Sequence, residues 1–169
     1  MPDPAGEGRK SSFAPVVDVR TRLLILGSLP GEVSLAEQRY YAHPRNRFWH
    51  LVGQAIGCDL TALPYNERLT TLLAHHVGLW DTIASAERRG SLDAAIRNEA
   101  HNPLADLAAT LPALRAVAFN GAKAAKVGRR LLATSPLTLI DLPSSSPAHA
   151  AMPLARKEEL WRHVGDFVR

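Results

Sequence analysis

The feature that most constrains the fold is a continuous apolar run closed by a glycine, Arg22-Leu-Leu-Ile-Leu-Gly27. A short run without alternating polar residues indicates a strand that is buried on both faces, as strands are in parallel sheets. Similar patterns predict further strands at 77–80, 113–119 and 137–140, and helices at 35–38, 48–56, 66–76, 103–111, 122–132 and 153–168. Strands that alternate with helices are typical of a parallel, doubly wound sheet, so we expect an α/β fold.

Length and composition indicate one globular domain. The chain has 169 residues, of which 46% are hydrophobic and 21% charged, and these are ordinary values for a single folded domain. Residues 1–12, rich in Pro, Gly and charge, are expected to form a flexible N-terminal segment, and 13–169 the domain. No apolar stretch is long enough for a membrane span, and no apolar segment of the signal-peptide type follows the start.

Cysteine content and net charge limit the function classes. The single cysteine, Cys58, excludes an internal disulfide, a four-cysteine zinc site and an iron–sulfur cluster. A chain of this kind is expected in a reducing compartment, the cytoplasm. The formal net charge of +4 mildly favours an acidic partner such as a nucleic-acid backbone.

The carboxyl ends of the predicted strands are the expected place for a ligand. Four segments follow these ends: 27–31, the residues from Asp81 onward, 120–121, and 142–149. Segment 27–31 lacks the third glycine of a dinucleotide-binding fingerprint and the Gly-Lys-Ser/Thr of a P-loop, so nucleotide binding is not supported. The four segments together predict one cleft.

The densest polar and aromatic run is Tyr40-Tyr-Ala-His-Pro-Arg-Asn-Arg-Phe-Trp49. Its tyrosines could stack on a base, Arg45 and Arg47 could bind phosphates, and the amide of Asn46 could hold a water. Structural roles compete with each of these. Phe48 and Trp49 fit a helix core, the arginines fit a solvated surface, and Asn is a favoured helix N-cap.

Four ordered segments carry a family resemblance: Gly27-Ser-Leu-Pro-Gly31, Tyr41-Ala-His-Pro-Arg-Asn-Arg-Phe-Trp49, Phe119-Asn-Gly121 and Leu142-Pro-Ser-Ser-Ser-Pro147. Together with the run from Gly78 to Asp93, they resemble the uracil-DNA glycosylase superfamily, and most closely its hypoxanthine-DNA glycosylase family. The resemblance implies a four-stranded parallel central sheet flanked by helices in three layers. It also implies a monofunctional DNA-repair hydrolase that flips a deaminated base, hypoxanthine or uracil, out of DNA and cuts its N-glycosidic bond without a metal or other cofactor.

The resemblance also assigns roles around the base. Leu29 stands where most of the superfamily carries Asp or Asn, and in the hypoxanthine family an Asn that corresponds to Asn46 is catalytic. Because an amide is not a strong base, Asn46 is expected to position the attacking water. The backbone of Ser28 and Leu29 would face the base oxygen, and Tyr41, with Tyr40 as its rival, would stack on the base.

Two further residues are assigned to the base, each with a structural alternative. Asp81 would accept from a base N–H, although it also fits a helix cap. Asn120 would bound the pocket, although Asn-Gly also fits a turn.

The segment 142–149 resembles the loop that related enzymes insert into the minor groove. Ser144, Ser145 and Ser146 are expected to approach phosphates, together with Arg45. Ala148 stands where thymine-DNA glycosylases carry an arginine wedge, so His149 is the candidate wedge. Ser91 and Asp93 also fit a helix start and receive no role.

The alternative function is a non-catalytic module that binds lesion or abasic DNA, because Leu29 removes the usual acidic water activator. On either interpretation the partner is DNA, no membrane is involved, and a monomer is expected. The compartment would then be the cytoplasm of a bacterial type of cell, with use at the nucleoid.

Overall fold

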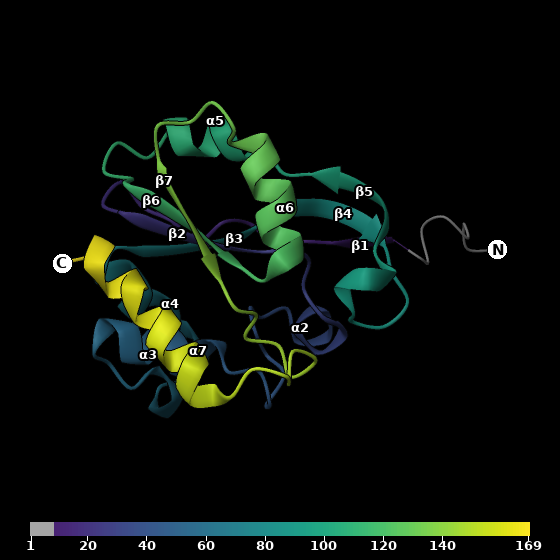
Figure 1. Ribbon diagram of the computed structural model, residues 1–169, viewed down its shortest axis with the longest axis horizontal. Helices are drawn as coiled ribbons and strands as arrows, with labels where there is room; N and C mark the ends of the chain where they lie inside the picture. Colours follow the sequence, from purple (N-terminus) through teal and green to yellow (C-terminus); the bar gives the residue numbers. More distant parts are fainter. Residues whose placement is uncertain (1–8) are drawn as a thin grey trace.

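The computed structural model describes residues 9–169, and its centre is a parallel sheet of four strands in the order β3-β2-β6-β7 (Figure 1). The strands are β2 (Leu23–Gly27), β3 (Val77–Asp81), β6 (Ala116–Asn120) and β7 (Thr138–Leu142). The predicted α/β fold with a four-stranded parallel sheet is confirmed, and each predicted strand is found within a few residues of its expected bounds.

Side chains of β2 alternate between two hydrophobic cores. Leu23 and Ile25 lie in the core formed with α3 and α7, while Leu24 and Leu26 lie in the core formed with α5 and α6. All four leucine and isoleucine side chains are at most 1% exposed. The continuous apolar run is therefore explained by burial on both faces of a period-two strand.

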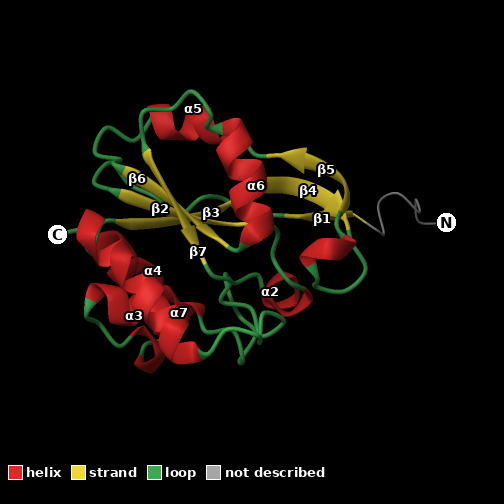
Figure 2. Cartoon of the chain, in the orientation of Figure 1, coloured by secondary structure: helices red, strands yellow, loops and turns green. Residues whose placement is uncertain are grey.

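Helices cover both faces of the sheet (Figure 2). They are α2 (Glu32–Glu37), α3 (Phe48–Ile56), α4 (Tyr65–Ala74), α5 (Leu104–Ala109), α6 (Ala122–Leu131) and α7 (Leu154–Trp161), with a 3₁₀ turn, η1, at Leu60–Ala62. The prediction of one helix over 153–168 is wrong in its second half, because Arg162–Phe167 continue as the 3₁₀ helix η3. Within residues 9–169, none of these helices has the length and apolar character needed to cross a bilayer.

Helix α6 lies unusually close to β6. A Cβ atom added to Gly128 would stand 2.2 Å from Cε1 of Phe119, so only glycine permits this approach. The contact holds the C-terminal half of α6 against β6.

A second, antiparallel sheet in the order β1-β4-β5 was not predicted. It consists of β1 (Arg9–Ser11), β4 (Ile83–Glu87) and β5 (Arg97–His101), with the 3₁₀ turn η2 (Asp93–Ala95) between the last two strands. The expectation of a flexible segment over 1–12 is wrong for its last four residues, because β1 pairs with β4 and the N–H of Ser12 donates to the carbonyl of Ala84. Residues 1–8 lie outside the described part of the chain.

Candidate active site

The four segments predicted to form a cleft do converge on one cavity of about 600 Å³. It lies at the carboxyl edge of the parallel sheet, and Gly27–Gly31, Asp81, Asn120–Gly121 and Ser144–His149 all line it. One wall was not expected: the segment that joins β4 to β5 contributes Ser91, Leu92, Asp93 and Ala94. The second sheet thus completes the cavity.

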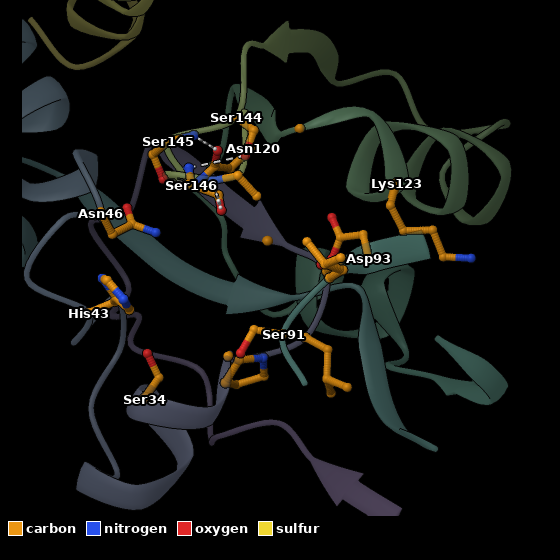
Figure 3. A pocket seen from close by; sticks show the side chains of 18 of the residues that line it. Ser34, His43, Asn46, Ser91, Asp93, Asn120, Lys123, Ser144, Ser145 and Ser146 are labelled. Carbon is orange, nitrogen blue, oxygen red and sulfur yellow. Dashed lines mark hydrogen bonds between the residues drawn. The ribbon is translucent and has the colours of Figure 1, made fainter. Parts of the chain in front are cut away.

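Asn46 lies in the loop before α3, and its side chain makes the capping contact that was one of its two alternatives. Its Oδ1 accepts the N–H of Phe48 at 2.9 Å, and Phe48 is the first residue of α3. The helix N-cap position itself belongs to Arg47, so Asn46 caps from one residue further out. Figure 3 shows the side-chain nitrogen directed into the cavity, on the same wall as His43. The amide therefore holds a helix N–H with its oxygen and offers a donor to the cavity with its nitrogen.

The two tyrosines have different surroundings. Tyr40 is 5% exposed, and its hydroxyl donates to the carbonyl of Ala14 at 2.8 Å, which accounts for it as a packing residue. Tyr41 stacks on Phe48 with ring centroids 3.8 Å apart, and it lines the cavity with a backbone φ of +53°. A left-handed backbone is uncommon for an aromatic residue, and such strain gathers at functional sites. Burial raises the pKa of Tyr41, with the charge of Asp81 adding to the effect, so its hydroxyl stays neutral.

Asp81 ends β3 and is 4% exposed. Among the described residues, its Oδ2 is buried without a hydrogen-bond partner. Burial, followed by the nearby charge of Asp93, raises the pKa of Asp81 to about 7, while the charge of Arg88 opposes the shift. A neutral carboxyl group is therefore well populated at physiological pH. It lies beside Gly27, where an added Cβ would stand 2.6 Å from Oδ1 of Asp81.

The loop after β2 uses its side chains away from the cavity. Leu29 is 6% exposed and packs with Ile83, Ala86 and Ile96 between the two sheets. The hydroxyl of Ser28 donates to Oδ1 of Asp93 at 2.5 Å, rather than closing its own turn. Backbone groups of this loop are therefore its principal means of contacting a ligand.

Asn120 and Ser145 form a reciprocal pair (Figure 3). Nδ2 of Asn120 donates to Oγ of Ser145, and the N–H of Ser145 donates to Oδ1 of Asn120, both at 2.9 Å. Ser145 is 1% exposed, so its hydroxyl is not available to DNA as the sequence interpretation expected. The pair instead ties the loop after β7 to the end of β6.

The remaining predicted DNA contacts lie at the rim. Ser144, Ser146 and His149 line the cavity, and the carbonyl of His149 accepts from Nζ of Lys157 at 2.7 Å. Arg45 is exposed and belongs to the Asn46 loop, but it does not line the cavity.

Lining residues that the sequence analysis gave no role include His43, Asp93 and Lys123. Nδ1 of His43 accepts the N–H of Arg45 at 3.1 Å, which leaves Nε2 as the proton-bearing nitrogen of the neutral ring. Lys123 pairs with Glu99 at 2.6 Å. His43 could have been found from its place three residues before Asn46, whereas Asp93 and Lys123 reach the cavity only through the packing of η2 and α6. Within residues 9–169, no group of three or more His, Cys, Asp or Glu side chains is arranged to hold a metal ion.

Comparison with known proteins agrees with this geometry. The family model of the uracil DNA glycosylase superfamily matches residues 14–165. A hypoxanthine DNA glycosylase of Methanosarcina barkeri is 42% identical over 81% of this chain and 87% of its own length. One of Methanosarcina acetivorans is 41% identical over 92% of this chain and 97% of its own length.

A solved structure shows the same arrangement. The solution NMR structure of a candidate uracil DNA glycosylase from M. acetivorans superposes with a TM-score of 0.82 at 40% identity. The superposition covers 92% of this chain and 98% of that one. On the extent of these matches, the chain belongs to the uracil DNA glycosylase superfamily.

Proposed function

We propose that this DNA N-glycosylase flips hypoxanthine or uracil out of DNA and hydrolyses its N-glycosidic bond, leaving an abasic site. The observation that carries the proposal is the cavity itself, in which the Asn46 amide and the backbone of the Ser28–Leu29 loop contribute to one space. The two Methanosarcina relatives described above are named for hypoxanthine, and the solved structure is named for uracil. Both bases are therefore candidate substrates.

The chemistry follows from the charges that develop as the bond breaks. Positive charge grows on the deoxyribose and negative charge on the departing base, so the site needs a placed water and donors near the base oxygen. The Asn46 nitrogen donates to the water and orients it beneath the sugar. The N–H groups of Ser28 and Leu29 supply donors to the base oxygen, and Tyr41 offers a ring edge or face to the base.

The rim residues are proposed to hold the DNA. Ser144, Ser146 and His149 surround the opening with small hydroxyls and an imidazole, and Arg45 projects from the neighbouring loop. Hydroxyls, backbone N–H groups and arginine are the usual phosphate contacts of DNA-binding proteins. His149 is proposed as the side chain that fills the gap left by the extruded nucleotide.

We propose that residues 13–169 act as one domain, as a monomer and in the cytoplasm. Support for one domain comes from the single family model that matches residues 14–165. Light scattering should give a solution mass near 18.4 kDa, and a stable dimer mass at micromolar concentration would refute the monomer.

Base release is tested with a panel of duplex oligonucleotides that each carry one modified base. We expect alkali-labile breaks at deoxyinosine or deoxyuridine, and none at the corresponding adenine or cytosine. A glycosylase of known activity serves as the positive control. Tight binding to these duplexes without base release would favour the non-catalytic module instead.

Two substitutions distinguish the two roles of Asn46, capping α3 and positioning the water. Asn46→Ala removes both the capping oxygen and the amide nitrogen, whereas Asn46→Ser keeps a side-chain oxygen suitable for capping. Both variants should lose base release by about 100-fold, since misplacement of a reacting group by about 1 Å can cost about 10²-fold. Only Asn46→Ala should lose stability, by about 1 kcal/mol. Single-turnover rates and urea unfolding measure the two effects.

The same pair of variants has a binding control. Affinity for duplex DNA with a tetrahydrofuran abasic analogue should stay close to that of the unsubstituted protein, because Asn46 acts on the water. A wild-type rate in Asn46→Ser would show that the residue only caps α3.

The raised pKa of Asp81 predicts that the rate of base release falls as the pH rises. A neutral carboxyl group presents an acceptor and a donor side by side, matching N1–H and O6 of hypoxanthine or N3–H and O4 of uracil. The ionised form presents only acceptors and repels the charge that develops on the base. Because the pKa of Asp81 is raised to about 7, the single-turnover rate should fall about tenfold between pH 6 and pH 8.

Asp81→Asn is the matched control for this dependence, since an amide offers the same donor and acceptor at every pH. Its rate should be flat between pH 6 and pH 8 and should exceed the wild-type rate at pH 8. A wild-type rate that instead rises with pH, and loses the rise in Asp81→Asn, would assign base recognition to the ionised carboxylate.

A further inference from the structure

We propose that Arg88 is a positioning residue that holds the Leu29 and Pro30 carbonyls and thereby keeps the N–H of Gly31 turned into the cavity, beside the N–H groups of Ser28 and Leu29. The inference rests on the proposed function, because it concerns the donors that face the departing base. Arg88 follows β4 directly and does not line the cavity, so its effect on the base passes through the loop.

Arg88 is a buried cation that is bonded to carbonyl groups. It is 4% exposed; Nε donates to the carbonyl of Gly90 at 2.9 Å, Nη1 donates to that of Leu29 at 3.3 Å, and Nη2 donates to that of Pro30. Within the described chain, no carboxylate lies within ion-pair distance of it, although Asp93, Glu32 and Asp81 lie near enough to influence its pKa. Burying a guanidinium is costly unless its N–H groups are bonded, so this fork is a specific arrangement.

The carbonyls of the loop are all held from one side. Besides the two bonded to Arg88, the carbonyl of Gly27 accepts the N–H of Thr82 at 2.8 Å, and that of Ser28 accepts the N–H of Ile83 at 3.0 Å. Four successive carbonyls, those of residues 27–30, are therefore bonded to donors in the segment 82–88, which consists of β4 and one residue on either side of it. Thr82, Ile83 and Arg88 are all buried behind the loop.

Peptide geometry then sets the direction of the N–H groups. In a trans peptide the N–H points opposite to the carbonyl of the preceding residue, and the described chain has no cis peptide bond. The N–H groups of Ser28, Leu29 and Gly31 therefore point away from the β4 side. These three residues line the cavity, which lies on that other side of the loop.

Contacts on either side of Arg88 hold the same two segments together. Oγ of Ser91 accepts the N–H of Glu32 at 2.9 Å, and the hydroxyl of Ser28 donates to Asp93. The turn 88–93 thus supports the loop at three points, of which Arg88 alone holds two adjacent peptide planes. Without it, the Leu29 and Pro30 carbonyls lose their donors. Because Pro30 has no N–H, the donor that these two planes carry is the N–H of Gly31, while the planes of the Ser28 and Leu29 N–H groups stay bonded to Thr82 and Ile83.

Fixed donors are worth most where charge develops during the reaction. Removal of one preorganised donor from such a site costs about 10²–10³ in rate. Loss of Arg88 loosens the Gly31 donor without deleting it, so we expect the single-turnover rate of hypoxanthine release to fall about 10- to 100-fold in Arg88→Met.

The matched control is Arg89→Met, because Arg89 is the adjacent, exposed arginine and should keep the wild-type rate. Affinity for tetrahydrofuran abasic DNA should stay within about twofold of wild type in both variants, since no base occupies the pocket. Amide hydrogen exchange in the 28–32 segment should accelerate only in Arg88→Met. This last measurement does not depend on activity.

Arg88→Lys guards against a folding failure of Arg88→Met. It keeps the charge but lacks the planar fork that spans two carbonyls, and it should slow base release by about tenfold. A wild-type rate in a folded Arg88 variant would overturn the inference, and so would equal losses of base release and abasic-DNA affinity. Absence of base release by the unsubstituted protein, with unchanged exchange results, would instead refute the proposed function.

Discussion

Parallel pairing of β2 with both β3 and β6 is the constraint on which the rest of the structure depends. It places the carboxyl ends of three strands at one edge, with Gly27 directly opposite Asp81 in the ladder. The loops that leave these ends lie around a common space. The double burial of β2 stabilises this arrangement, because any shift of register by one residue would exchange the side chains of its two cores.

The antiparallel sheet gives that space its shape. Its first strand after β3 begins within two residues of Asp81, and its backbone takes up the carbonyls of the loop beyond β2. The 88–93 turn then returns to the same loop with Arg88, Ser91 and Asp93. The backbone of residues 27–30 is thus held by hydrogen bonds from the second sheet and its turn. It needs neither a glycine-rich phosphate loop nor a long helix after β2.

The sequence predicts the parallel sheet, the order of its helices and the four converging loops, because these depend on local periodicity and on strong turn residues. It does not predict the second sheet. β4 and β5, Ile83–Glu87 and Arg97–His101, contain Ala, Asn, Glu and Arg, which have little preference for strands. The pairing of β4 with β1 comes from contacts distant in the sequence.

Contacts between residues distant in the sequence also decide the roles of individual residues. Arg88 stands in a charged run, Glu87-Arg88-Arg89, that is typical of a solvated surface, and only the tertiary fold buries one of the two arginines. Asn46 could be singled out because a motif surrounds it, yet its sequence could not show that oxygen and nitrogen serve different partners. Ser145 shows the reverse case, in which a residue of the correct type and place is consumed by a structural pair with Asn120.

Gly27 carries a consequence for how such a site changes during evolution. A methyl group at this position would stand 2.6 Å from Asp81 Oδ1 and 3.0 Å from the Tyr41 hydroxyl. Any side chain at residue 27 therefore requires earlier or simultaneous changes at its two neighbours. The three positions therefore form an epistatic unit, in which a larger residue at 27 is tolerated only with compensating changes at 41 and 81.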